Sequence, residues 1–419
     1  MALTHSAWAI PSTLHGAQHR REVAGAWSDP CLEAQPLASG AHLRAHLWDL
    51  HQACTSEWCK LRRPIAESPQ GNIACMEIAM NTPCLPVIPF DLLMQYQVED
   101  VGDTRFRACA RLLQSMWRED QRLPVGSHKQ TNEYDRCLGS RLDRASGLSG
   151  RNFLTARIAR LAKYETVYRE LGAMIEEERL WHNLLSSQPL CFNLFGDMKL
   201  DLSMATRFWS SLFPDLMAKV DAIYFEHSPG RGNEAFIADQ TAFDVLVAGQ
   251  DRKGHRSFIS IEVKYSESMN EPPATIRPRH EAVAAGSGLF KDPAHPSLRS
   301  APIQQLWREH MLSQTMLENG LYDSGMFLVV YPAMNEDCAL AVSAYCQHLQ
   351  EPGIGNPSFR VLTLEECVKS LRSIGESELA DALFARYLDF KRIEQAIFGT
   401  DAMNFTYNPV GEGYLKLES

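Results

Sequence analysis

The residues whose chemistry stands out are Asp244, Glu262 and Lys264, each of which lies in an otherwise apolar run. Because successive side chains of a β-strand point to opposite faces, a strand over 258–265 places Glu262 and Lys264 side by side. Two adjacent carboxylates suit a hard divalent cation such as Mg²⁺, with Mn²⁺ as an alternative. A neighbouring lysine can orient or deprotonate a water that attacks a phosphate. These residue types therefore predict metal-assisted hydrolysis of a phosphate ester.

A β-hairpin would bring Asp244 to the other two residues. The run 243–247 has the composition of a strand, and the polar segment 249–255 is typical of the turn that follows it. In such a hairpin Asp244 lies beside Glu262. The alternative is a solvated hairpin face that carries an ordinary ion pair and does no chemistry.

The segments on either side of this hairpin predict an α/β domain with a mixed central sheet flanked by helices. Helical spacing extends over 153–185, and apolar strands are expected at 220–225 and 325–331. A Pro- and Gly-rich excursion spans 272–302, and a helix is expected at 303–317. The predicted order is therefore helix, three strands, helix and strand.

The aspartate and the Glu-x-Lys tripeptide resemble the signature of the PD-(D/E)xK nuclease superfamily. The predicted order of elements is also similar to the restriction-endonuclease-like core of that superfamily, αβββαβ. This resemblance implies a metal-binding pair at Asp244 and Glu262 and a catalytic lysine at Lys264.

Longer strings within 117–390 resemble a bacterial family of restriction-endonuclease-like proteins that are largely uncharacterised. These strings are 184–195, 225–231, 242–244, 261–267 and 304–308. The closer resemblance implies a metal-dependent nuclease fold, and it does not imply a particular substrate.

Two polar residues in the expected helices are further site candidates. Gln305 lies near the start of the helix after Glu-x-Lys, where members of the superfamily often place a glutamine that touches substrate or water. Glu178 could supply a third metal-binding carboxylate, because many relatives carry an acidic residue in the preceding helix. The alternative in both cases is a solvated helix residue.

Phosphate-binding residues are expected in two places. Arg231 follows Glu226 in a Pro-Gly turn, where backbone amides and a guanidinium could hold a phosphate. Thirteen Lys or Arg and five Asp or Glu lie between residues 105 and 163, a local excess of positive charge that could track a phosphate backbone. The substrate-binding candidates at the end of this stretch are Arg151, Arg157 and Arg160. The alternatives are a surface turn, and arginines that offset the net charge of −10.

Other segments are expected to support the site. The segment 184–195, interrupted by Pro189, is interpreted as core and loop scaffolding in which Gln188 and Asn193 are the polar members worth testing. Helices are expected over 339–349, after the capping box at 363–366, and over 379–398.

We expect four regions in the 419 residues. They are a poorly defined N-terminal appendage (1–100), a basic helical or loop segment (101–150), the nuclease-like domain (151–400) and a C-terminal tail (401–419). The appendage holds Cys31, Cys54, Cys59, Cys75, Cys84, His42, His46 and His51, for which a zinc site is a weak alternative without Cys-x-x-Cys spacing. A natural start at Met76 or Met80 is a second alternative.

Composition favours a cytoplasmic protein. The first residues lack the pattern of a secretory signal, and no apolar run approaches the length of a membrane span. Eleven scattered cysteines fit reduced thiols.

The sequence thus predicts a nuclease that hydrolyses phosphodiester bonds, of DNA in the first place, by means of a metal-activated water. The expected partner is a nucleic acid, no membrane is involved, and a second copy of the chain is a further candidate partner. The alternatives are an RNA-directed nuclease and a catalytically silent nucleic-acid-binding or interaction module with the same fold.

Overall fold

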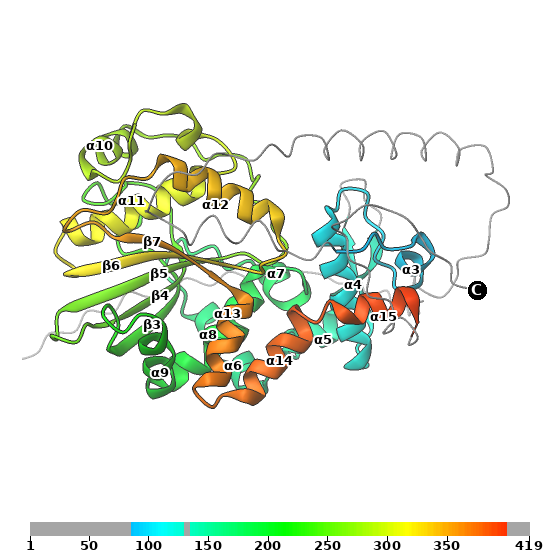
Figure 1. Cartoon of the computed structure of the whole chain (residues 1–419). Coiled ribbons are helices and arrows are strands. Elements are labelled where there is room, and N and C mark those ends of the chain that lie inside the picture. Colours follow the sequence, from blue (N-terminus) through cyan, green and yellow to red (C-terminus); the bar gives the residue numbers. More distant parts are fainter. Residues whose placement is uncertain (1–84, 130–134, 400–419) are drawn as a thin grey trace, which may run out of the picture. The chain divides into compact units, whose positions relative to one another are not determined.

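The computed structural model describes residues 85–129 and 135–399 (Figure 1). A five-stranded sheet lies at its centre, with the strand order β3-β4-β5-β6-β7. The strands are β3 (Lys219–His227), β4 (Phe243–Gln250), β5 (Arg256–Val263), β6 (Ser324–Tyr331) and β7 (Ser358–Thr363). Within the first three strands the neighbours are antiparallel, whereas β6 runs parallel to β5 and β7 runs parallel to β6. The predicted mixed α/β fold is confirmed.

Helices cover both faces of the sheet (Figure 1). One face packs against α10 (Pro278–Ser287), α11 (Gln304–Glu318) and α12 (Glu336–His348). The other packs against α6 (Ala156–Val167), α8 (Ser187–Leu200), α9 (Leu202–Leu212), α13 (Leu364–Ser373) and α14 (Ser377–Tyr387). The alternation along β5 explains this arrangement, because Ile259, Ile261 and Val263 enter one core and Phe258 the other.

The segment 184–195, expected as core and loop scaffolding, is buried in the core as expected, but it is largely the helix α8 and not a loop. Ser186 caps the helix by accepting a hydrogen bond from the amide of Gln188. Pro189 lies in the first turn, where a missing amide hydrogen breaks no helical hydrogen bond. Asn193 is buried and structural, since its side chain accepts a hydrogen bond from Leu154 and donates one to Tyr387.

The basic segment joins the same core as the sheet. It forms α4 (Arg105–Asp120), the antiparallel strands β1 (Val125–Lys129) and β2 (Asp135–Leu142), and the short helix α5 (Arg144–Leu148). The ring of Phe106 in α4 packs on Tyr265, which follows β5, and on Phe390. Gln114 of α4 donates hydrogen bonds to Tyr265 and to the carbonyl of Arg386.

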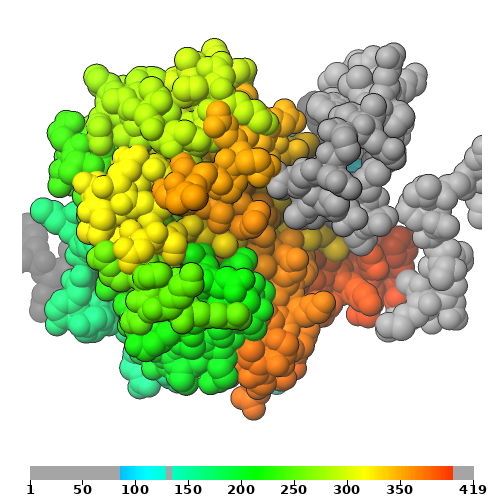
Figure 2. Space-filling view, turned by 60° about the vertical axis from the view of Figure 1, so that its left-hand side comes forward, coloured from blue at the N-terminus to red at the C-terminus, as the bar shows by residue number. Residues whose placement is uncertain are grey.

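Short elements complete the described part. They are α3 (Phe90–Gln95), α7 (Glu177–His182), the 3₁₀ helix η1 (Pro296–Arg299) and α15 (Lys391–Phe398). The predicted capping box is confirmed, because Thr363 and Glu366 bond each other's backbone amides at the start of α13. Figure 2 shows at the surface that segments distant in the sequence, coloured green, yellow and orange, lie side by side on one face.

Several predictions lie outside the described residues. These are the cysteines and histidines considered for zinc, the alternative starts at Met76 and Met80, residues 1–84 of the appendage and the tail 401–419. No helix in the described part of the chain combines the length and apolarity that a membrane span requires.

Candidate active site

Three acidic residues occupy neighbouring positions on adjacent strands. Phe225 of β3 pairs with Val245 of β4, which in turn pairs with Ile261 of β5. Because β4 is antiparallel to both neighbours, the next position pairs Glu226 after Phe225, Asp244 before Val245 and Glu262 after Ile261, which brings these three residues into a row. The predicted hairpin therefore does place Asp244 beside Glu262, and the register adds Glu226.

Lys264 and Gln305 close the other side of this row. The Lys264 Nζ lies 2.9 Å from the Glu262 Oε1 and donates a hydrogen bond of 2.9 Å to the Gln305 Oε1. The Gln305 Nε2 in turn donates to the Glu262 Oε1 at 2.8 Å. Glu262, Lys264 and Gln305 thus form a closed triangle between the end of β5 and the start of α11. The backbone of Lys264 is fixed as well, because its amide donates to the carbonyl of Val330 in β6.

Burial and mutual repulsion make the carboxylate row electrostatically unusual. Burial raises the pKa of Asp244 well above its ordinary range, and the negative charges of Glu262 and Glu226 raise it further. A hydrogen bond from the amide of Val263, 2.8 Å long, offsets part of this shift. Burial also raises the pKa of Glu226, with a further contribution from Glu262. A positive charge beside Asp244 and Glu226 would therefore stabilise their ionised forms.

Lys264, in contrast to Asp244, is surrounded by groups of opposite charge. Burial alone would lower the pKa of Lys264, but the charges of Glu262, Glu271 and Glu267 raise it above its ordinary value. Lys264 is therefore a protonated donor in the metal-free protein. Only 6% of its surface is exposed, so its charge depends on these carboxylates.

A small void adjoins the carboxylates. It has a volume of about 10 Å³, close to the space that one water molecule needs. The void lies between α8, the end of β3 and the start of β4. Its lining residues are Ile175, Gln188, Cys191, Phe192, Phe225, Glu226 and Asp244. Gln188 is held in place by hydrogen bonds with the backbone of Met174 and Glu176.

The backbone of Glu226 is strained. Its φ is 49°, in the left-handed region that residues other than glycine seldom adopt. Strained backbone of this kind is concentrated at functional sites, where the surrounding structure maintains it. The sequence indicated Glu226 only as the end of a strand, and nothing in the sequence alone would have revealed its backbone conformation or its approach to Asp244.

Glu309 is a second residue that the sequence analysis missed. It lies one helical turn after Gln305 on α11 and accepts a hydrogen bond of 2.9 Å from the Gln305 Nε2. Burial and the charge of Glu262 raise its pKa well above the ordinary range. Its buried Oε2 has no hydrogen-bond partner among the described residues. The available signal was the i, i+4 spacing from Gln305, which places both side chains on one helix face.

Glu267 fixes the segment that follows β5. Its carboxylate accepts hydrogen bonds from the amides of Tyr265, Ser266 and Ser187 and forms an ion pair with Arg179. Burial would raise the pKa of Glu267, but Lys264, the amides of Ser187 and Tyr265 and the charge of Arg179 lower it below its ordinary value. This carboxylate therefore links Lys264 to the start of α8.

Glu178, the predicted third metal-binding carboxylate, forms an ion pair with Arg141. Its carboxylate pairs with the Arg141 Nη1 at 2.6 Å, and 62% of its side chain is exposed. The negative charges that raise the pKa of Asp244 are those of Glu262 and Glu226, and Glu178 is not among them. The structure thus brings Glu226, rather than Glu178, to the strand carboxylates.

The guanidinium of Arg231 is engaged by the protein itself. It donates to the carbonyls of Gly172, Gln240 and Glu226, and 9% of the side chain is exposed. Its Nε is buried without a partner in the described part of the chain. Arg231 therefore holds the turn after β3 together.

The basic candidates fall into two groups. Arg157 pairs with Asp197 at 3.7 Å. Arg151 and Arg160 are exposed, have no ion pair among the described residues and line a larger cavity beside α6. The stretch predicted from charge alone is thus partly neutralised by local carboxylates.

The carboxylates of Asp244 and Glu262 suit a hard divalent cation, because oxygen donors bind such cations and a cation would offset their mutual repulsion. Within 85–129 and 135–399, no three His, Cys, Asp or Glu side chains are already arranged as a complete metal site. A cation here would have few protein ligands and would keep several waters, which is how Mg²⁺ is commonly bound.

Comparison with known proteins gives one match. A family model described as the PD-(D/E)XK nuclease superfamily matches residues 101–389, which is more than half of the chain. No curated protein and no solved structure matches the chain.

Proposed function

Because the chain belongs to the PD-(D/E)XK nuclease superfamily, we propose that it is a nuclease that hydrolyses phosphodiester bonds of DNA with a divalent cation. The superfamily indicates a nuclease and a nucleic-acid substrate, and its members generally use divalent metal ions. The resemblance of the longer sequence strings to restriction-endonuclease-like proteins favours DNA over RNA.

Asp244 and Glu262 would hold the cation, and Glu226 is positioned to assist from the neighbouring strand. Mg²⁺ is the expected ion because both Asp244 and Glu262 are carboxylates, and Mn²⁺ has similar ligand preferences. Such a cation supplies Lewis-acid chemistry at a phosphodiester, whose negative charge increases during hydrolysis. The raised pKa of Asp244 supports this assignment, since a carboxylate that resists ionisation alone gains most from a neighbouring cation.

Lys264 would act as a hydrogen-bond donor to the phosphate or to the attacking water. Its ammonium group is already fixed by Glu262 and Gln305, so little reorganisation is needed when charge develops. Gln305 would orient Lys264 and Glu262 at the same time, which makes it a positioning residue.

The observation that carries the proposal is the convergence of Asp244, Glu262, Lys264 and Gln305 from three separate elements. An ordinary surface ion pair is solvated, whereas Glu262 and Lys264 are 4% and 6% exposed. Burial of this charged cluster is costly and calls for a functional reason. Cytoplasmic location and homodimerisation remain expectations; the buried thiols of Cys191, Cys338 and Cys367 agree with a reducing compartment.

The test is incubation of the purified full chain with Mg²⁺ or Mn²⁺ and linear, circular and single-stranded DNA and RNA, with EDTA as the metal-free control. We expect metal-dependent cleavage of DNA, and the circular substrate distinguishes an endonuclease from an exonuclease. Cleavage of RNA but not of DNA would show that the substrate is RNA. Absence of cleavage under all conditions would contradict the proposal and favour a silent binding module.

A further inference from the structure

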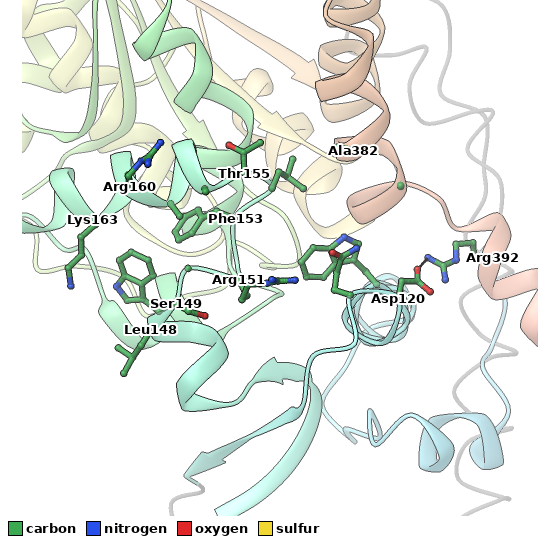
Figure 3. A pocket seen from close by; sticks show the side chains of 18 residues that line it. Asp120, Leu148, Ser149, Arg151, Phe153, Thr155, Arg160, Lys163, Ala382 and Arg392 are labelled. Carbon is green, nitrogen blue, oxygen red and sulfur yellow. Dashed lines mark ion pairs between the residues drawn. The ribbon is translucent and has the colours of Figure 1, made fainter.

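A second and larger cavity, of about 870 Å³, shares no lining residue with the void beside Asp244. Its volume is typical of small-molecule sites, which range from about 300 to 1,000 Å³. Figure 3 shows Arg160 and Lys163 at one side of the cavity, Asp120 and Arg392 at the other, and Arg151 between them. The residues come from α4, α5, α6, α7, α14, α15 and the loop that precedes α6.

The charge of this cavity is positive. Arg151, Arg160 and Lys163 are exposed, and none of them forms an ion pair within the described residues. Asp120 is the one carboxylate of the described lining, and it pairs with Arg392 at 2.7 Å. The guanidinium groups of Arg151 and Arg160 therefore remain available to an anionic ligand, and so does the ammonium of Lys163, which lies 5.8 Å from the ring centroid of Trp181.

Two features of the wall reinforce this charge. Arg386 is fully buried, has no carboxylate partner in the described part of the chain, and lies 4.1 Å from the ring centroid of Trp117, which lines the cavity. The N-terminus of α6 also opens here, because Thr155 and Ala156 belong to the lining. The positive end of a helix favours an anion such as phosphate.

The remaining wall is apolar and aromatic. Phe153 and Trp181 meet edge to face with ring centroids 5.2 Å apart, and Leu148 is 60% exposed at the rim. Phe153 also contacts Phe192, which lines the void beside Asp244, with centroids 6.2 Å apart. A ligand that matches this cavity therefore combines a negatively charged group with an apolar, flat body.

We propose that this cavity binds a nucleoside phosphate, with the phosphate at Arg151, Arg160 and Lys163 and the base against the aromatic wall. The ligand is either a free nucleotide or one unit of a nucleic-acid strand, since both present the same chemistry. The proposal concerns binding alone and does not rest on nuclease activity.

The test is isothermal titration calorimetry on the full chain in EDTA, so that no cleavage takes place. The probes are adenosine and guanosine 5′-monophosphate and a short single-stranded DNA oligonucleotide. The variants are the double substitution Arg151→Ala/Arg160→Ala and the matched control Arg144→Ala. Arg144 is an exposed arginine of the same basic stretch (105–163) and does not line the cavity. We expect the double variant to raise Kd by about tenfold or more, and the control to leave it unchanged.

If the wild-type chain binds the mononucleotides and the double variant does not, the ligand is a free nucleotide. Binding of the oligonucleotide alone, lost in the same variant, would identify a unit of a strand. The proposal is overturned if neither probe binds the wild-type chain, if the double variant binds as tightly as wild type, or if Arg144→Ala weakens binding equally.

Discussion

At the scale of single residues, Asp244 and Glu262 have different roles in the metal-free protein although both are buried carboxylates. Glu262 is paired with the Lys264 ammonium and with Gln305. Asp244 has no cationic partner at hydrogen-bonding distance in the described part of the chain and accepts a hydrogen bond from the amide of Val263. Their substitution should therefore affect stability in opposite ways.

We expect Asp244→Asn to leave the free energy of unfolding of the metal-free protein unchanged or higher, because it removes repulsion from Glu262 and Glu226. Glu262→Gln should lower it by about 3 kcal/mol, because it takes the closest partner from the buried Lys264. Urea unfolding in EDTA measures both. Equal losses in the two variants would contradict this distinction.

Lys264 should contribute to turnover more than to binding. We expect Lys264→Ala to lower kcat by about 10²- to 10³-fold, as the loss of a donor in a transition state does, while the Kd for DNA changes little. Single-turnover cleavage and binding in EDTA separate the two effects. Because Lys264 is buried, circular dichroism must first show that the variant folds. A variant that keeps its turnover would exclude Lys264 from the chemistry.

The residues of the site were partly predictable from the sequence. The contact between Glu262 and Lys264 follows from the alternation of a strand, and that between Asp244 and Glu262 follows from a short hairpin. Glu226 was not predictable as a site residue, because its approach depends on the register between β3 and β4. For Glu309 the i, i+4 spacing from Gln305 gave the shared helix face, but the approach to Glu262 depends on the packing of α11. Such distances are set by tertiary structure, which spacing alone does not contain.

At the scale of elements, Asp239 fixes the position of the helix that carries Gln305. It precedes β4, and its carboxylate is 3.1 Å from the His280 Nε2 of α10 and 3.2 Å from the Arg308 Nη1 of α11. Burial would raise its pKa, but hydrogen bonds from His280 and Thr241 and the charge of Arg308 lower it to about 2. The ionised carboxylate therefore stabilises the fold.

We expect Asp239→Asn to lower the free energy of unfolding at pH 7 by about 2 kcal/mol. Because the folded-state pKa lies below the unfolded value of about 4, this stabilisation is present above pH 4 and is lost as the pH falls towards 2. Wild type and variant should thus converge in acid. A difference in stability that stays constant from pH 7 to pH 3 would exclude an electrostatic origin.

Elements with strong periodicity were predictable, and others were not. The strand β6 and the helix α11 follow from apolar runs that end at polar residues. The parallel strand β7 was missed, because Ser358–Thr363 is short and its pairing partner lies distant in the sequence. The helix α8 was missed because it is apolar all round, so it has no amphipathic pattern, and because Pro189 suggested a break.

At the scale of the whole molecule, one hydrophobic cluster extends from Phe106 in α4 through β5 to Ile393 in α15. The carboxylate row lies at the margin of this core, so a bound cation should stabilise the entire cooperative unit. We expect Mg²⁺ or Mn²⁺ to raise the Tm of the wild-type protein, by an amount equivalent to about 2.7 kcal/mol at a concentration of 100 Kd. Asp244→Asn should abolish the rise. A metal-induced shift that persists in this variant would place the cation elsewhere.

The central claim is that the strand carboxylates support metal-dependent cleavage of DNA. Its most direct test compares initial cleavage rates in Mg²⁺ for wild type, Asp244→Asn and Asp215→Asn. Asp215 provides a matched control, because it is 90% exposed and pairs only with the surface residue Arg252 among the described residues. We expect Asp215→Asn to cleave at the wild-type rate and Asp244→Asn to retain less than about one part in 10² of it. Cleavage by Asp244→Asn at the wild-type rate would contradict the claim.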